Sequence, residues 1–316
     1  MTRVLITGGC GFIGSNLVEF LLKQTNWEFN ILDNLSTGRL KDIEVLHEFQ
    51  EKINFFKGDI ANYKDVSKAI KGCEFVVNLA AQTGVLDSIN NPFKDEKVNI
   101  RGILNLLQLS KESNIKRFIQ ASSGAALGEQ EIPIHELKVP KPISPYGASK
   151  LAGEAYCSAF SYSYGLRCIV LRFSNVYGPK SYNKGSVIAK FIKKILKGET
   201  IEIYGDGYQT RDFIYVDDIS NGIYLSLVKN LSNFQVFQLG TGLETSINSL
   251  MEKIKEVLNE NSYKIPDIVY TEQKSGEILR NYTDISKAKE ILGYSIKKEL
   301  DQGLRETFKW FLNNFD

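Results

Sequence analysis

A tyrosine and a lysine at helical spacing are the residues of this chain best suited to acid–base chemistry. Tyr146 and Lys150 lie one helical turn apart at the start of a predicted helix, so their side chains point to the same side. A neighbouring ammonium group favours the phenolate, so we expect Lys150 to lower the pKa of Tyr146 towards a value useful to a general base. The spacing alone does not single out this pair. Two pairs in the second half share it, Tyr270 with Lys274 and Tyr294 with Lys298.

The strand predicted for residues 117–123 ends in two hydroxyls, Ser122 and Ser123. Hydroxyls at a strand end also cap turns, and from these residues alone a capping role and a chemical role are about equally plausible. Chain order favours Tyr146 over the other tyrosines, because Tyr146 comes shortly after this serine-bearing strand. Ser123, Tyr146 and Lys150 are therefore the candidate catalytic residues.

These groups follow a glycine-rich turn near the start of the chain. The apolar run Val4–Ile6 is predicted as a buried strand, and residues 12–22 have the apolar spacing of a helix. Between them lie Gly8, Gly11 and Gly14, which serve a tight turn, a close phosphate approach and contact of helix with strand. Such a turn brings free backbone N–H groups and the positive end of a helix to one point, which binds a pyrophosphate.

An acidic residue ends the next predicted strand, residues 29–33. A carboxylate at Asp33 suits two ribose hydroxyls and repels a 2′-phosphate, so the sequence favours NAD over NADP. The alternative is a plain turn without a ligand. The preceding strand, the following helix and the acid all favour the dinucleotide site. Later strand ends, at Asp59 and Ile60 and at Leu79–Ala81, are predicted to line the same crevice.

Composition narrows the possible functions. The chain has 316 residues, of which 43% are apolar and 24% charged, and its net charge is +2. This balance shows no electrostatic signature of nucleic acid or membrane binding, and no apolar run approaches the ~20 residues that span a bilayer. The four cysteines lack metal spacing and fit a reducing cytoplasm. Neither His47 nor His135 lies in a ligand-like cluster, so we expect no metal site.

The helix expected after Pro92 is apolar on more than one side. A helix of this kind has more to bury than a sheet alone can cover, and a partner subunit is the simplest second cover. We therefore expect a homodimer. The apolar positions are Ile100, Ile103, Leu104, Leu106, Leu107 and Leu109.

Together these motifs resemble the extended short-chain dehydrogenase/reductase superfamily, in its NAD-dependent nucleotide-sugar epimerase/dehydratase branch. The resemblance covers nearly the whole chain and continues through residues 171–179, 204–213 and 239–242. It implies an α/β fold: a Rossmann-like doubly wound parallel sheet with a smaller C-terminal α/β substrate domain. We expect an NAD-binding domain over residues 1–175 and a nucleotide-sugar domain over 176–316, with the segment 213–238 returning to the first.

Pattern and resemblance together give a set of expected cofactor contacts. Most lie at the glycine turn or at strand ends, whereas Asn99 rests on the resemblance alone. The set is Gly8, Gly11, Phe12, Ile13, Gly14, Asp33, Asn34, Asp59, Ile60, Leu79, Ala80, Ala81, Asn99, Tyr146 and Lys150.

Within the branch the sequence is most similar to UDP-glucose and UDP-N-acetylglucosamine 4-epimerases. The resemblance implies that Tyr146 removes the proton of the sugar 4-hydroxyl while NAD takes hydride from C4. Ser123 matches the serine that hydrogen-bonds the 4-oxygen, and Lys150 matches the lysine that binds the nicotinamide ribose. The implied substrate residues are Ser123, Asn175, Arg211, Lys274 and Asn281. Asn281 falls at the gate beside the sugar 2-substituent, where a small residue admits N-acetyl groups. The alternative is that Asn281 faces solvent and its neighbour Tyr282 closes the pocket.

Two alternatives remain open on the same fold. A 4,6-dehydratase or a decarboxylase would carry an Asp-Glu pair or a Glu directly after the catalytic hydroxyl residue, and here Gly124 and Ala125 stand there. A non-catalytic NAD-binding regulator would typically lack the tyrosine or the lysine, and both are present. Lys274 stands where the family usually has arginine, which keeps the charge but loses the bidentate fork.

Overall fold

A parallel sheet organises the first half of the chain. The computed structural model describes residues 1–273 and 278–314. Its main sheet has the strand order β11-β6-β5-β4-β1-β2-β3, and every neighbouring pair is parallel. The strands are β1 (Arg3–Thr7), β2 (Glu28–Asp33), β3 (Ile53–Lys57), β4 (Phe75–Asn78), β5 (Arg117–Ser123), β6 (Cys168–Phe173) and β11 (Phe234–Leu239). The expected Rossmann-like, doubly wound fold is confirmed.

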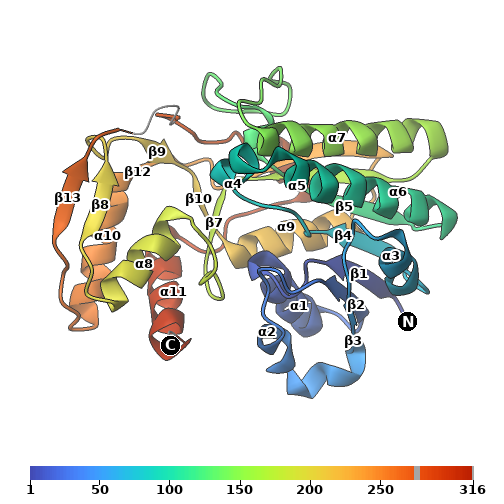
Figure 1. Cartoon of the computed structure of the whole chain (residues 1–316), viewed down its shortest axis with the longest axis horizontal. Coiled ribbons are helices and arrows are strands. Elements are labelled where there is room, and N and C mark those ends of the chain that lie inside the picture. Colours follow the sequence, from blue (N-terminus) through green and yellow to red (C-terminus); the bar gives the residue numbers. More distant parts are fainter. Residues whose placement is uncertain (274–277, 315–316) are drawn as a thin grey trace.

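Helices cover both faces of this sheet (Figure 1). One face carries α1 (Phe12–Gln24) and α9 (Val216–Val228), and the other carries α3 (Tyr63–Ala69), α6 (Gly102–Glu112) and α7 (Pro145–Tyr164). Successive strand residues point to opposite faces. In β1, Val4 and Ile6 therefore join the core under α1 and α9, whereas Leu5 joins the core under α3, α6 and α7.

The strand order reverses direction next to β1. From β1 the chain continues outwards to β2 and β3, and it then returns to place β4 on the other side of β1. In parallel sheets of this kind ligands bind in the crevice outside the strand ends at the reversal. Here Thr7 of β1 pairs with Asn78 of β4, so the glycine turn and the loop after β4 flank one crevice.

The helix expected after Pro92 is present as one continuous run over residues 92–112, with a π-helical turn inside it. The chain forms α4 (Val85–Asn90), α5 (Pro92–Glu96), a π-helical turn η2 (Lys97–Arg101) and then α6. Leu107 is fully buried in the chain's own core, as are most of the apolar positions counted on this stretch. They are covered by the sheet and by α3 and α7, so they do not require a partner subunit.

The smaller lobe lies beside the carboxyl edge of the sheet (Figure 1). It contains α8 (Val187–Leu196), α10 (Ile247–Glu260), α11 (Leu300–Asn314) and the parallel pair β8 (Ile201–Tyr204) with β13 (Ile268–Thr271). The short strands β7 (Asn175–Tyr177) and β10 (Phe213–Tyr215) pair with each other, as do β9 (Thr210–Arg211) and β12 (Thr245–Ser246). The minor elements are α2 (Lys41–Glu44), η1 (His47–Lys52), η3 (Gly124–Ala126) and η4 (Ala288–Leu292). The proposed domain limits stay a prediction.

Candidate active site

The glycine turn is packed too closely to hold side chains. Gly8 has φ +69°, and a Cβ added to it would lie 2.7 Å from the backbone nitrogen of Ala80. A Cβ on Gly14 would collide with the carbonyl oxygen of Gly8 and lie 2.6 Å from Cα of Gly9. The first turn of α1 therefore rests directly on the end of β1, beside the loop that follows β4.

The N-terminus of α1 is an open anion site. The N-cap is Gly11, which supplies no side-chain cap, and the first turn holds no acidic residue. The backbone N–H groups of Phe12 and Ile13 belong to the turn that has no intrahelical acceptors. Exposed donors at the positive end of a helix suit a pyrophosphate. The cradle thus fits the dinucleotide that the sequence predicts.

Asp33 lies at the end of β2, on the adenosine side of this cradle. Its Oδ1 accepts the N–H of Leu35 at 2.8 Å and its Oδ2 accepts the N–H of Cys10 at 3.0 Å. Burial raises the pKa of Asp33, and these two backbone donors oppose that rise. A carboxylate oxygen has two acceptor sites, so each can still take a ribose hydroxyl.

Three neighbouring residues are expected at the same end of the crevice. Asn34 Nδ2 donates to Asp59 Oδ2 at 3.1 Å, which ties the loop after β2 to the end of β3. Ile60 is buried, and its side chain fills the space next to Gly102 at the start of α6. The three residues expected at the adenosine end are thus brought together with Asp33.

The loop after β4 is held in place by Asn99. Leu79 donates its N–H to the carbonyl oxygen of Thr7 at 3.1 Å, which extends the pairing of β4 with β1 towards Ala80 and Ala81. The Asn99 amide receives the N–H of Gln82 at 2.9 Å and donates to the carbonyl of Gln82 at 3.0 Å. The same amide nitrogen also contacts Asp95 and Ser149, so the hydrogen-bonding groups of the Asn99 side chain are already used by other residues of the chain. Asn99 therefore acts on the crevice through the loop it holds.

The serine, tyrosine and lysine meet at the carboxyl edge of the sheet. Ser123 is the last residue of β5, and its side chain lies near enough to Tyr146 to lower the pKa of that phenol. Lys150 Nζ lies 5.7 Å from the centre of the Tyr146 ring and donates to the carbonyl oxygen of Ala121 at 3.1 Å. The helix that carries Tyr146 and Lys150 begins at Pro145, so both side chains project from its first two turns.

Burial shifts both titratable groups of this cluster towards their neutral forms. It raises the pKa of Tyr146 to about 12, although the side chain of Ser123 opposes the rise. It lowers the pKa of Lys150 to about 8, against the opposing charges of Asp95 and Glu154. In the protein without ligands, the expectation of a lowered Tyr146 pKa is therefore wrong. The Lys150 ammonium lies near the ring and donates to a carbonyl oxygen, and desolvation of the Tyr146 phenol outweighs the effect of the Lys150 charge.

The smaller lobe contributes a cavity of about 270 Å³. Asn175 and Arg211 line it, together with Lys190 and Tyr204. The Arg211 guanidinium donates to the carbonyl oxygens of Thr210 at 2.7 Å and Ile278 at 2.8 Å, which fixes its plane. A fixed guanidinium beside an amide suits a phosphate oxygen pair.

The two remaining substrate predictions lie on the segment that follows β13. Lys274 falls outside the described residues. Asn281 is partly buried and is not among the residues that line the cavity. On one side of it Arg280 binds Glu244 at 2.7 and 2.6 Å, and on the other the carbonyl oxygen of Tyr282 accepts the N–H of Ile134 at 3.0 Å. The backbone beside Asn281 is thus fixed on both sides.

Sequence reasoning did not assign a role to Asp212. This fully buried carboxylate accepts the N–H of Thr241 at 2.8 Å and the hydroxyl of Thr283 at 2.7 Å. It therefore joins the segment after β11 to the segment that carries Asn281. Its place within the motif 204–213 was a signal, but the distant partners were not visible from the sequence.

The buried pair of Glu154 and Arg172 was also missed. Arg172 binds Glu154 at 2.6 Å, and the same carboxylate receives the hydroxyl of Ser122 at 2.5 Å. Of the two hydroxyls at the end of β5, Ser122 is therefore used inside the protein. Ser123 caps η3 by accepting the N–H of Ala125 at 3.2 Å, and its side chain also lowers the pKa of Tyr146.

The described residues contain neither a membrane-spanning helix nor a metal-binding cluster. None of the helices in residues 1–273 and 278–314 is long and apolar enough to cross a membrane. Over the same residues, no group of three or more His, Cys, Asp or Glu side chains is arranged to hold a metal ion.

Comparison with known proteins assigns the family. The model of the NAD dependent epimerase/dehydratase family matches residues 4–240, and the chain belongs to this family. Its cofactor is accordingly NAD. The role of each individual residue in binding or catalysis stays a prediction.

Three similar proteins are 4-epimerases of UDP-sugars. The structure of UDP-glucose 4-epimerase from Thermotoga maritima with UDP-glucose is 35% identical, with a TM-score of 0.90 and full coverage of both chains. The structure of UDP-N-acetylglucosamine 4-epimerase from Methanobrevibacter ruminantium in complex with UDP-N-acetylmuramic acid is 35% identical, with a TM-score of 0.92 and 99% of each chain covered. A UDP-glucuronate 4-epimerase from Thermodesulfobacterium geofontis is 34% identical over 100% of this chain and 98% of its own.

The position of Asp33 predicts how the chain selects its cofactor. Asp33→Ala removes the carboxylate that suits the ribose hydroxyls, so NAD should dissociate at least ~10-fold more readily, as for the loss of a charge-assisted hydrogen bond. The preference for NAD over NADP should narrow as well. Titration of both cofactors measures the two constants. Glu51→Gln, at an exposed acid remote from the crevice, is the matched control. An unchanged preference would show that another group reads the ribose.

Proposed function

We propose that this chain catalyses NAD-dependent epimerisation at C4 of a UDP-hexose through a transient 4-keto sugar. One observation carries the proposal. Ser123 lies near enough to Tyr146 to lower its pKa, and the Lys150 ammonium lies 5.7 Å from the centre of the Tyr146 ring, at the strand edge that flanks the glycine turn. This arrangement places a proton acceptor and an oxygen-binding hydroxyl where a sugar hydroxyl would meet the cofactor.

The chemistry follows from what each side chain can do with a proton. Tyr146 accepts the proton of the sugar 4-hydroxyl, and Ser123 holds the 4-oxygen in line. NAD, when bound, supplies a hydride acceptor and a positive charge next to this cluster. Because burial raises the pKa of Tyr146 to about 12, the phenolate needs nearby positive charge to form at neutral pH. Lys150 provides one such charge while it remains protonated.

The geometry argues against dehydration or decarboxylation. Elimination of the 6-hydroxyl requires a second proton donor next to the catalytic hydroxyl. The residues after Ser123 form η3 (Gly124–Ala126), which has no titratable side chain, and a Cβ added at Gly124 would meet no atom within 4 Å. The space beside Ser123 is thus open. A non-catalytic regulator would not require the assembled serine, tyrosine and lysine.

The substrate nucleotide is proposed to bind in the cavity of the smaller lobe. Arg211 and Asn175 line this cavity, and a guanidinium can bond two diphosphate oxygens at once. Lys274 remains a second diphosphate contact by proposal. Asn281 is proposed as the gate beside the sugar 2-substituent, where its small amide admits an acetamido group and can hydrogen-bond it.

We also propose that the protein works in the cytoplasm. Its four cysteines are free and buried, with no disulfide among them. A chain that is stable without disulfides suits a reducing compartment.

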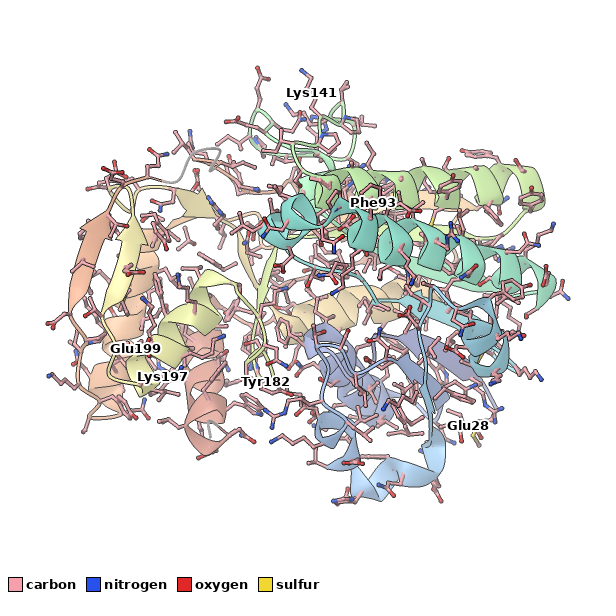
Figure 2. The ribbon with its side chains drawn as sticks, in the orientation of Figure 1. Glu28, Phe93, Lys141, Tyr182, Lys197 and Glu199 are labelled. Atoms are coloured by element: carbon pink, nitrogen blue, oxygen red, sulfur yellow. The ribbon has the colours of Figure 1, made fainter. Side chains whose placement is uncertain are left out.

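We propose a homodimer, but through a different surface from the apolar positions of the helix after Pro92 on which the sequence-based prediction rested. On α4 and α5, Leu86, Ile89 and Phe93 are exposed to 68%, 55% and 83%. Figure 2 shows Phe93 on the outer side of α5, beside the long helices α6 and α7. Clustered exposed apolar side chains mark association surfaces.

A panel of UDP-sugars tests the reaction itself. The purified protein should interconvert UDP-glucose with UDP-galactose, or a closely related C4 pair, without added reductant. Formation of a 4-keto-6-deoxy sugar or of carbon dioxide would contradict the proposal. The products are separated by anion-exchange chromatography.

Tyr146→Phe should lower turnover by ~10²–10⁴, the usual contribution of a positioned acid–base group. Bound NAD should change little, because the ring keeps its packing. Tyr162→Phe removes the same hydroxyl from an exposed position on the same helix and should leave turnover unchanged. Turnover close to the parent level in Tyr146→Phe would remove this tyrosine from its role.

Because Asn281 is small, its proposed place at the gate predicts that plain and N-acetylated UDP-hexoses are both substrates. Asn281→Tyr should remove activity on N-acetylated sugars selectively, because a phenol ring fills the space of the acetamido group. Asn281→Ser keeps the position small and should retain both activities. The ratio of kcat/KM for UDP-N-acetylglucosamine and UDP-glucose is the measurement, and an equal loss on both sugars would place the gate elsewhere.

Phe93→Asp should convert a dimer to a monomer, because it introduces a charge at the most exposed apolar side chain of α5. Light scattering at micromolar concentration gives the mass. Leu137→Asp, at a similarly exposed leucine outside the helices, should leave the mass unchanged. A parent protein that is already monomeric would refute the dimer.

A further inference from the structure

A segment of the smaller lobe is fastened to the larger lobe beside the glycine turn. We call residues 179–185 the clasp. At its start, Asn16 of α1 donates its side-chain amide to the carbonyl oxygen of Pro179 at 3.0 Å. Lys180 then binds Glu19 of the same helix at 2.8 Å and is itself buried. The clasp therefore begins on the outer surface of α1.

The middle of the clasp is held from both lobes. The Arg39 guanidinium lies 4.1 Å from the ring centre of Tyr182, whose hydroxyl bonds Asp42, and the same ring stacks on Trp310 at 5.6 Å. Figure 2 shows Tyr182 at the junction of the two lobes. Asn183 donates its amide to the carbonyl oxygen of Thr37 at 2.6 Å. These contacts fix the backbone that leads to Lys184.

Lys184 extends from the clasp to the start of α1. Its Nζ lies 5.6 Å from the centre of the Phe12 ring, the first residue of that helix. Over residues 1–273 and 278–314, its ammonium has no ion pair with an acid and no hydrogen bond, whereas Lys180 and Lys194 each bind a glutamate. Among the described residues, the charge of Lys184 thus has no protein counter-ion.

Two cations share this crevice. Burial lowers the pKa of Lys184, and the Lys184 charge in turn contributes to the lowered pKa of Lys150. Lys184 is partly buried, and a partly desolvated ammonium gains from a bound anion. The folded chain therefore presents a site that an anionic ligand completes.

We propose that Lys184 binds a pyrophosphate in this crevice and so links the smaller lobe to the bound ligand. The ligand group is a pyrophosphate because the ammonium converges on the N-terminus of α1, where the backbone N–H groups of Phe12 and Ile13 already favour phosphate. The proposal rests on the proposed function, which brings two pyrophosphates to the protein, that of NAD and that of the nucleotide sugar. The position over Phe12 favours the dinucleotide.

The test compares ligand binding in four forms of the full-length protein: the parent, Lys184→Gln, Lys184→Arg and Lys197→Gln. Lys197 is an exposed lysine that follows α8, and Figure 2 shows it on the outer side of the smaller lobe, away from Tyr182. Each protein is freed of bound nucleotide and titrated by calorimetry with NAD, with adenosine and with UDP. Thermal unfolding of each form checks that it is folded.

We expect Lys184→Gln to weaken NAD binding about 10-fold, as for the loss of one hydrogen bond to a charged group, and to leave adenosine binding unchanged. Lys184→Arg keeps the charge, so its dissociation constant for NAD should stay within about 3-fold of the parent value. Lys197→Gln should bind NAD as the parent protein does. Weaker UDP binding with unchanged NAD binding would support the pyrophosphate contact and assign it to the nucleotide sugar.

Unchanged binding of both NAD and UDP in a folded Lys184→Gln protein would overturn the proposal. An equal loss for NAD and adenosine would overturn it too, because it would assign Lys184 a structural role. These binding measurements do not depend on turnover. A failure of the epimerase proposal would appear as missing C4 interconversion by a parent protein that still binds NAD.

Discussion

The contact between Gly14 and Gly8 is the constraint on which the site depends. Because neither residue has a side chain, the first turn of α1 lies against the end of β1, and its N–H groups open at the point where the strand order reverses. A methyl group at Gly14 would move the helix away from the strand, and one at Gly8 would collide with the loop after β4. Asp33, the loop after β4 and the serine–tyrosine–lysine cluster are then placed around this point by the carboxyl edge of one sheet.

The site is electrostatically incomplete within the chain itself. Burial favours the neutral forms of Tyr146 and Lys150, and Lys184 has a charge without a protein partner in the described residues. The ligands that the site fits supply what is missing, a pyrophosphate for the cation and positive charge for the phenolate. Binding of these ligands therefore changes the electrostatic environment of Tyr146, so ligand binding and formation of the phenolate are coupled.

Sequence patterns predicted those parts of the site that are formed by residues close together in the chain. The glycine turn, Asp33 and the spacing of Tyr146 from Lys150 each depend on one strand end or one helix. The sequence could not show that the helix after Pro92 contains a π-helical turn, η2, or that Leu107 is covered by the chain's own core. Those features depend on packing between distant segments. The sign of the Tyr146 pKa shift was wrong for the same reason, because desolvation depends on every element around the ring.

The most direct test of the account follows the hydrogen at C4 of the sugar. UDP-glucose that carries deuterium at C4 is incubated with the protein in ordinary water, and the product is analysed by NMR and mass spectrometry. If the hydrogen removed from C4 is returned to the opposite face of the same carbon, the product keeps the deuterium at C4. Loss of the deuterium to water, or its appearance at another carbon, would contradict C4 epimerisation through a transient 4-keto sugar.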